Sequence, residues 1–300
     1  MAGLASGGRA EVMDRSPRPV ARGGKAQAAG SGAAAPGFEA LIAAAKLGGM
    51  VGFVVADAAT GAVLEAHEPQ AKLPPASVAK SITALYALEK LGPQHRFVTR
   101  VLATGPVAGG VVQGDLVLAG GGDPTLQTDQ LGDLVARLAK DGLKGATGRF
   151  LVWDGALPRL ETITDDQPVH VGYDPALSGL NLNFNRVYFE WKKAGGDWQV
   201  GLDARGERFV PAVAGITGRV VKRESPLFTY DQSPGREDWT VASAALGKGG
   251  SRWLPVRQPA AYVAEVFRVL ARAQGIDLPK GEAVAALPAG AEVGRVESEP

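Results

Sequence analysis

The sequence contains no cysteine among its 300 residues. Disulfide bonds, thiolate nucleophiles and cysteine-ligated zinc are therefore excluded. The three histidines, at positions 67, 95 and 170, lie far apart and lack the spacing of metal ligands, so we expect no metal and no cofactor. An excess of charge of one sign is missing too, since 32 basic and 31 acidic residues give a formal net charge of +1. This balance predicts no nucleic-acid partner and no strong attraction to an anionic membrane.

Long apolar runs are also absent, and no segment approaches the roughly 20 apolar residues that a membrane-spanning helix needs. We therefore expect no transmembrane segment. The first 35 residues are rich in Gly, Ala, Arg and Pro, and they lack the continuous apolar stretch of a signal peptide. We interpret residues 1–36 as a disordered lead. The remaining chain is long enough for a sizeable core, because 45% of all residues are hydrophobic.

Local patterns predict a first group of elements between residues 37 and 97. The stretch FEALIAAAKLG indicates a short helix that ends near Gly48. Residues 51–66 read as a β-hairpin around the turn DAATG. A second helix follows Pro75, with apolar residues at helical spacing from Ile82 to Leu91, and Gly92 and the following proline end it.

The chain beyond residue 97 changes in texture. Strands alternate with glycine-rich turns, and two segments have the period of amphipathic helices, QLGDLVARLAKDGL and AAYVAEVFRVLARAQGI. TGRFLVWD reads as a strand, and residues 180–230 indicate mostly β structure. Asn181, Asn183 and Asn185 alternate with apolar residues, which predicts a strand with one polar face.

The stretch LPPASVAK carries the strongest chemical signal. Ser77 stands three residues before Lys80, and residues three apart on a helix share a face and can touch. A serine hydroxyl becomes a good nucleophile only when a base takes its proton, and a neutral lysine can serve as that base. The start of a helix also favours negative charge developing beside Ser77.

A plainer interpretation is that Ser77 only caps a helix, because serine is a preferred N-cap residue. Ser-x-x-Lys also arises by chance about once in a chain of this length. Two features favour chemistry: the motif occurs once in the sequence, and it follows a hairpin and opens a mostly apolar helix. Penicillin-recognising enzymes keep their serine in that context.

Three stretches together resemble the D-alanyl-D-alanine carboxypeptidase/endopeptidase family, the class C low-molecular-mass penicillin-binding proteins. PPASVAK looks like the first active-site motif of the family, GDLVLAGGGDPTL like its Gly-Asp-Pro segment, and YDPALSGLNLNFN like another typical stretch. The resemblance implies an α/β (α+β) fold, in which a β-lactamase/transpeptidase-like serine domain carries a large, mostly β insertion after the nucleophile helix. The first part of the catalytic domain would then occupy residues 37–97, the insertion residues 98–285, and residues 286–300 would start the return to the catalytic domain.

The resemblance also implies a function. It makes Ser77 the nucleophile and Lys80 its base, in an enzyme that hydrolyses peptidoglycan peptide stems through an acyl-serine and is acylated by β-lactams. Asp154, at the end of the strand RFLVW, would bind the amine of a stem peptide, although an aspartate that merely starts a turn is the commoner case. The substrate implies the periplasm as the location, whereas no sorting signal in the sequence does.

The sequence departs from the family in two motifs. Neither Ser-x-Asn nor Lys-Thr-Gly occurs in it, and Lys248 is followed by two glycines. We therefore expect the chain to be the N-terminal part of a longer enzyme. Two alternatives stay open: a β-lactamase-type hydrolase, and a non-catalytic module that binds cell-wall peptides. GGGDP lacks the spacing of a dinucleotide-binding loop, so a structural glycine turn is favoured over a phosphate site.

Overall fold

The structure, a computed structural model, describes residues 37–299. The lead predicted for residues 1–36 lies outside the described residues. The chain divides into two compact units, one up to Ser81 and one from Ile82 onward, and each is described by itself below. Within residues 37–299, every helix is too short or too polar to cross a membrane.

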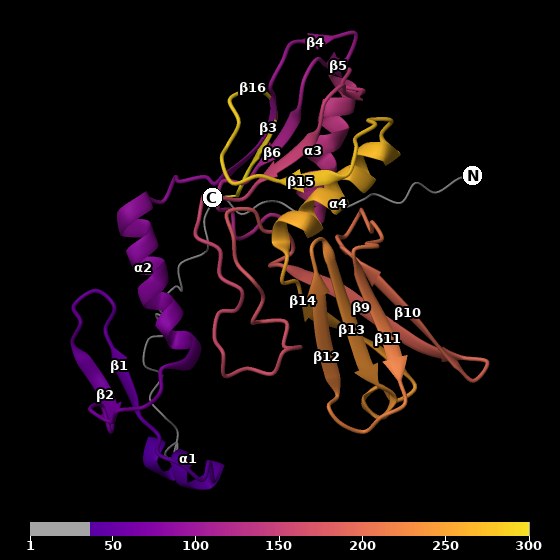
Figure 1. The fold of residues 1–300 in the computed structure, drawn as a ribbon. Helices are drawn as coiled ribbons and strands as arrows, with labels where there is room; N and C mark the ends of the chain where they lie inside the picture. Colours follow the sequence, from indigo (N-terminus) through magenta and orange to yellow (C-terminus); the bar gives the residue numbers. More distant parts are fainter. Residues whose placement is uncertain (1–36, 300) are drawn as a thin grey trace, which may run out of the picture. The chain divides into compact units, whose positions relative to one another are not determined.

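The first unit holds the predicted short helix and hairpin. Helix α1 spans Phe38–Ala45, and strands β1 (Phe53–Ala56) and β2 (Val63–His67) pair antiparallel (Figure 1). Asp57 shapes the turn between the strands, because its carboxylate accepts hydrogen bonds from the backbone N–H groups of Ala59 and Thr60. The 3₁₀ turn η1 (Ala76–Val78) follows and leads directly into helix α2 (Ala79–Leu91), which continues into the second unit.

The second unit is built on a five-stranded mixed sheet with the strand order β15-β8-β6-β3-β16 (Figure 1). These strands are β3 (Val98–Ala103), β6 (Leu116–Ala119), β8 (Phe150–Trp153), β15 (Gly281–Ala283) and β16 (Ala291–Glu297). Helices α3 (Thr128–Lys140) and α4 (Pro259–Ala273) pack against each other and against this sheet. A small sheet adds β4 (Val107–Ala108), β5 (Val111–Val112) and β7 (Gly145–Ala146).

Both predicted amphipathic helices bury their apolar faces. Leu131, Leu134, Val135 and Leu138 of α3 are buried, and α4 buries Val263, Val266, Phe267 and Leu270. The strands supply the other half of this core by alternation, since Phe150 and Val152 join the cluster with the helices. Neighbouring strand residues of opposite orientation form a smaller apolar cluster of Leu102, Val117, Ala119 and Leu151.

A β-rich part of the second unit contains two three-stranded sheets. One has the order β10-β9-β14, from β9 (Arg186–Ala194), β10 (Asp197–Asp203) and β14 (Gly249–Pro255). The other has the order β11-β13-β12, from β11 (Ile216–Val221), β12 (Phe228–Ser233) and β13 (Arg236–Ala242), and the turn η2 (Ser243–Ala245) follows it. Phe189 and Trp239 are fully buried in the same continuous core as the helices. This mixture of sheet and helix agrees with the fold class predicted from the sequence.

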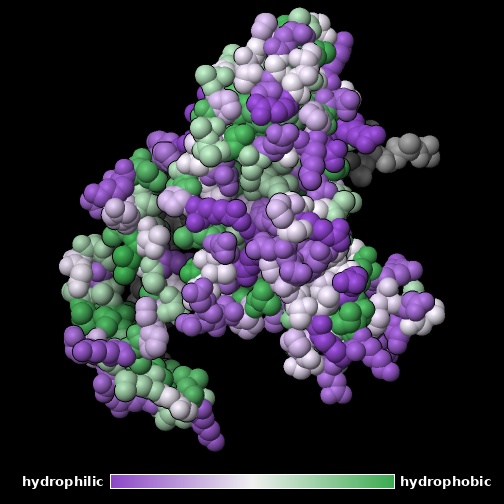
Figure 2. Space-filling view, viewed as in Figure 1, coloured by the Kyte–Doolittle hydropathy of each residue, from purple (hydrophilic) through white to green (hydrophobic). Residues whose placement is uncertain are grey.

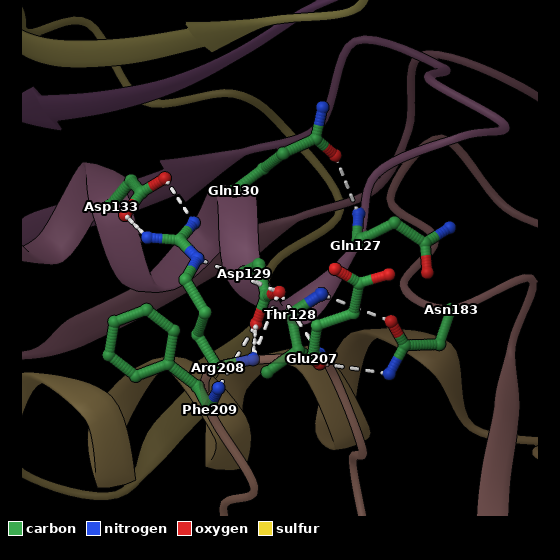
Figure 3. Close-up of polar contacts among 9 residues, drawn as sticks. All are labelled: Gln127, Thr128, Asp129, Gln130, Asp133, Asn183, Glu207, Arg208 and Phe209. Carbon is green, nitrogen blue, oxygen red and sulfur yellow. Dashed lines mark hydrogen bonds and ion pairs between the residues drawn. The ribbon is translucent and has the colours of Figure 1, made fainter. Parts of the chain in front are cut away.

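A polar clasp joins the loop after β10 to helix α3 (Figure 3). The carboxylate of Asp129 accepts backbone hydrogen bonds from Glu207, Arg208 and Phe209, at 3.0–3.2 Å. One turn further along α3, Asp133 pairs with the guanidinium of Arg208, and this pairing lowers the pKa of the Asp133 carboxyl. The clasp therefore holds the β-rich part against the helix by side-chain contacts to the backbone.

The asparagine stretch is where the sequence-based prediction was wrong. Residues 183–185 form a left-handed turn, with φ between 49° and 57°, and not a strand with one polar face. The asparagine side chains replace the backbone pairing that a strand would have: Asn185 donates to the carbonyl of Ala176 at 2.7 Å, and Asn183 bonds to Thr128. Asparagine tolerates left-handed φ better than most residues, which explains why the stretch turns here.

The glycine run before Pro124 is structural, as favoured from the sequence. A Cβ at Gly120 would lie 2.3 Å from the carbonyl oxygen of Gly179, and one at Gly121 would lie 2.1 Å from that of Val98. Two chain segments therefore approach this run more closely than any side chain allows. Glycine at positions 120 and 121 thus allows the backbone at Gly179 and at Val98 to pack directly against this turn.

Candidate active site

Ser77 and Lys80 meet as their spacing suggests. The side-chain nitrogen of Lys80 donates a hydrogen bond to Ser77 Oγ, with 2.8 Å between Nζ and Oγ. Ser77 lies in the turn η1, and Lys80 is the second residue of α2, so the junction of two helical segments brings the side chains to one face. The distance suits proton transfer between the two groups, which is the geometry a serine nucleophile and its base require.

The backbone before Ser77 is fixed by its sequence. Pro75 has φ −71° and accepts a hydrogen bond from the N–H of Val78 at 2.9 Å, which closes the turn. Ala76 adopts φ +45°, a left-handed conformation that costs a residue with a Cβ about 1–2 kcal/mol. Non-glycine residues of this kind cluster at functional sites, where surrounding structure holds them in place. The strained residue directly precedes the candidate nucleophile.

The side chain of Ser77 is accessible to solvent, and its backbone N–H has no acceptor among residues 37–299. Both Ser77 and Lys80 are exposed. Within residues 37–299, no acceptor takes the backbone N–H of Ser77, whereas the hydroxyl of nearby Ser81 is occupied by the carbonyl of Val78 at 2.7 Å. Of the two serines around this junction, only Ser77 is thus hydrogen-bonded to a lysine.

Asp154 belongs to the second unit and directly follows β8. Its backbone carbonyl accepts a hydrogen bond from Gly179 at 2.7 Å, and a Cβ on Gly179 would lie 2.4 Å from that oxygen. The stretch YDPALSGLNLNFN, which was quoted above for the family resemblance and contains Gly179, therefore fixes the backbone at Asp154. The carboxylate of Asp154 makes no hydrogen bond or ion pair with any residue of the range 37–299, and it is half-buried.

A cavity of about 920 Å³ lies beside Asp154, within the second unit. Its lining comes from the end of β8, the turn between β12 and β13, one face of α4 and the strand β15. Seven charged residues contribute to that lining: Asp154, Arg159, Arg236, Glu265, Arg268, Lys280 and Glu282. Sequence reasoning singled out Asp154 but missed the other residues of this lining, because they are spread over about 130 positions and share no motif.

Comparison with known proteins places the chain in a family. The sequence profile of the D-Ala-D-Ala carboxypeptidase 3 (S13) family matches residues 37–300. A D-alanyl-D-alanine carboxypeptidase from Actinomadura sp. (strain R39) is 38% identical over 140 residues, which are 45% of this chain and 26% of that protein. The D-alanyl-D-alanine carboxypeptidase DacB of Haemophilus influenzae is 32% identical over 105 residues, 35% of this chain and 22% of that protein.

Solved structures share the fold. The crystal structure of penicillin binding protein 4 (dacB) from Haemophilus influenzae superposes with a TM-score of 0.62 at 22% identity, over 82% of this chain and 56% of that chain. A structure of the same protein complexed with a novel β-lactam gives a TM-score of 0.58, also at 22% identity, over 82% of this chain and 54% of that chain. This chain matches about a quarter of the length of the two curated relatives and about half of the solved chains. By the match of the family profile over residues 37–300, the chain belongs to the D-Ala-D-Ala carboxypeptidase 3 (S13) family.

Proposed function

We propose that this chain carries the nucleophile and the base of a serine-type D-Ala-D-Ala carboxypeptidase or endopeptidase that acts on peptidoglycan peptides. The observation that carries the proposal is the 2.8 Å hydrogen bond between Lys80 Nζ and Ser77 Oγ, at the motif that resembles the first active-site motif of the family. Membership of the S13 family supports the reaction class. The β-lactam complex of a structural neighbour supports acylation by β-lactams.

The reaction follows from the two side chains. Ser77 Oγ attacks the carbonyl carbon of the scissile peptide bond while neutral Lys80 takes the hydroxyl proton. The tetrahedral intermediate collapses, the C–N bond breaks, and the leaving amine receives a proton. Water then hydrolyses the acyl-serine ester and regenerates the hydroxyl. The unoccupied backbone N–H of Ser77 supplies one donor of an oxyanion hole.

Two parts of the function lie outside the catalytic pair. We propose that the free carboxylate of Asp154 binds the amine of a stem peptide, since a half-buried carboxylate with no partner among the described residues favours a cationic ligand. We also infer a periplasmic location, because peptidoglycan peptides lie outside the inner membrane.

The Ser-x-Asn and Lys-Thr-Gly motifs of the family are absent from these 300 residues. We therefore propose that hydrolysis by the whole protein also needs residues other than Ser77 and Lys80.

The test is covalent labelling of the full-length protein with a fluorescent penicillin, followed by peptide mapping of the adduct. We expect the label on Ser77 and none in Ser77→Ala. Ser81→Ala is the matched control, because Ser81 lies one turn away with its hydroxyl bonded to a backbone carbonyl, and it should label like the unmodified protein. Label on another serine, or undiminished labelling of Ser77→Ala, would overturn the assignment.

A further inference from the structure

We propose that the cavity beside α4 binds an acidic peptide, and that Arg268 and Lys280 receive its carboxylate groups. The inference deepens the proposed function and rests on it only for the source of the peptide, because peptidoglycan stem peptides carry free carboxylates. It concerns a site in the second unit, whereas Ser77 and Lys80 lie in the first.

The cations of the cavity are not equally engaged. Arg236 is held by Asp238, with 2.8 Å between Nε and a carboxylate oxygen, and Arg159 donates to a backbone carbonyl at 3.0 Å. Arg268 and Lys280 make no ion pair or hydrogen bond with any residue between 37 and 299. Two positive charges therefore line the cavity without a partner, and they favour an anionic ligand.

The carboxylates of the lining do not cancel those charges. Glu265 accepts the backbone N–H groups of Ala214 at 2.6 Å and Gly215 at 3.0 Å. Glu282 lies 4.0 Å from the guanidinium of Arg149. Arg149 itself pairs with Asp115 at 2.9 Å. The third carboxylate is that of Asp154, directly after β8. Among residues 37–299, none of the three carboxylates forms an ion pair with Arg268 or Lys280.

Arg268 and Lys280 lie toward the same end of the cavity. A Cβ on Gly281 would lie 2.6 Å from the Cβ of Ala264, so α4 packs directly on β15 at this point. A short connection joins the two elements, which therefore run in opposite directions (Figure 1). Arg268 follows Ala264 by one turn toward the carboxyl end of α4, and Lys280 precedes Gly281, so both are displaced in the same direction.

The length of the cavity fits several peptide residues. Because Gly281 pairs with Phe150 in the parallel ladder, Lys280 lies level with Arg149, and Asp154 follows five residues further along. At about 3.3 Å per residue, the backbone positions of Lys280 and Asp154 are offset by roughly 16 Å along the strands. An extended peptide of three residues covers more than half of that offset, whereas a single inorganic anion occupies only one position along it.

The apolar part of the lining argues for a peptide over a flat ring. It consists of prolines, alanines and glycines, namely Ala214, Gly215, Pro234, Gly235, Pro259, Ala260, Ala261, Ala264, Gly281 and Ala283. No aromatic side chain of the described residues lines the cavity, so nucleobases and sugars find no ring to stack on. A narrow main chain with carboxylates at intervals suits such walls better.

The experiment measures binding of the tripeptide acetyl-L-Ala-γ-D-Glu-L-Lys to the full-length protein by calorimetry. The tripeptide has two free carboxylates and lacks D-Ala-D-Ala, so it cannot acylate the enzyme, and Ser77→Ala is used as the background. We expect saturable binding that weakens as salt is raised. Arg268→Gln and Lys280→Gln should each weaken it roughly tenfold or more, since each removes a hydrogen bond between charged groups.

Matched controls separate the site from general effects. Arg272→Gln changes an exposed arginine of the same helix that does not line the cavity, and it should bind the tripeptide as the background protein does. Thermal unfolding of each variant reports whether the fold is kept. Lys280→Gln should disturb the fold least, because Lys280 is exposed. The diamide of the tripeptide, which has no carboxylate, should not bind.

Each other outcome contradicts the proposal. Absence of saturable binding, equal binding of the diamide, or unchanged affinity in both Arg268→Gln and Lys280→Gln would overturn it. Equally tight binding of inorganic phosphate at the same residues would show a simple anion site and not a peptide site. Penicillin labelling of Ser77 is scored separately: a tripeptide that binds to a protein without such labelling would leave this site standing and remove the proposed function.

Discussion

Helices α2 and α3 have the same length, 13 residues, but they contribute to the structure in different ways. In α3 the side chains of Leu134 and Leu138 are 0% and 2% exposed, and in α2 those of Ile82 and Leu85 are 72% and 66% exposed. Both helices carry apolar residues at helical spacing. An apolar pattern therefore predicts that a helix has a face to bury, but it does not say which surface covers that face.

The same contrast holds between the regions around these helices. Helices α1 and α2 bury no residue, and Figure 2 shows apolar residues at the surface over the segments that Figure 1 draws in indigo and violet. The part of the second unit from β3 onward, by contrast, has a large buried core that includes both α3 and α4. Exposed apolar patches mark surfaces that bind other protein. The candidate catalytic pair thus lies in the region with exposed apolar side chains, and the large buried core lies in the other.

The largest expected effect separates chemistry from stability. Lys80→Arg keeps a positive charge beside Ser77 Oγ but cannot deprotonate, so the rate of acylation by penicillin should fall by about 10²–10⁴-fold. The free energy of unfolding should not change, because Lys80 is exposed. Acylation kinetics and urea unfolding of the same preparation check both statements. A variant that acylates at nearly the original rate would show that the lysine is only a structural cation.

A pair of leucine truncations tests the contrast between the helices directly. Leu134→Ala removes a fully buried side chain of α3 and should lower the free energy of unfolding by about 2–5 kcal/mol. Leu85→Ala on the exposed face of α2 should change it by less than about 0.5 kcal/mol. Both values come from urea unfolding of the 300-residue chain. A comparable loss in Leu85→Ala would mean that α2 is covered by a surface after all.

The close approach between α3 and the loop after β10 gives a smaller effect. Gly132 faces the ring of Phe209, and a Cβ there would lie 2.6 Å from a ring carbon, beside the Asp129 clasp of Figure 3. Gly132→Ala should therefore destabilise the fold by about 1–3 kcal/mol, although alanine favours helices over glycine. Gly201→Ala, where a Cβ meets open space, is the matched control and should be neutral within about 0.5 kcal/mol. Stabilisation by Gly132→Ala in thermal unfolding would show that the loop is not packed on α3.

The elements that could be predicted from the sequence are those whose signal is local. The two amphipathic helices, the hairpin around Asp57 and the contact between Ser77 and Lys80 all depend on residues fewer than about fifteen positions apart. Period and turn chemistry are sufficient there. Asp154 was found at the end of its strand for the same reason. Its binding role stays a prediction.

The features that escaped prediction depend on distant residues. Asn183 takes part in a turn because its side chain bonds to Thr128, 55 positions earlier, and nothing in the alternating pattern reveals that partner. The cavity likewise joins Lys280 to Asp154 through the pairing of β15 with β8. Tertiary contacts of this kind override local propensity, and a single sequence does not display them.

The smallest expected effect concerns pH and the loop before Asp174. His170 stacks on Phe228, with ring centroids 4.3 Å apart, and Arg252 lies over the same ring at 4.7 Å. Burial, and then the positive charge of Arg252, lower the pKa of His170 below its ordinary value of 6.5. The unfolded chain therefore binds more protons than the folded one at pH values just below 6.5, so His170 contributes stability that is complete above pH 6.5 and is lost as the pH falls.

His170→Phe keeps a stacked ring without a titrating group. The difference in Tm between the unmodified protein and His170→Phe should be constant above pH 6.5 and should shift against the unmodified protein below it. The shift should be smaller than every effect above, because the partly exposed imidazole is screened by solvent. A difference that stays constant down to pH 5 would show that His170 titrates alike in both states, and the loop would then be held by its other contacts alone.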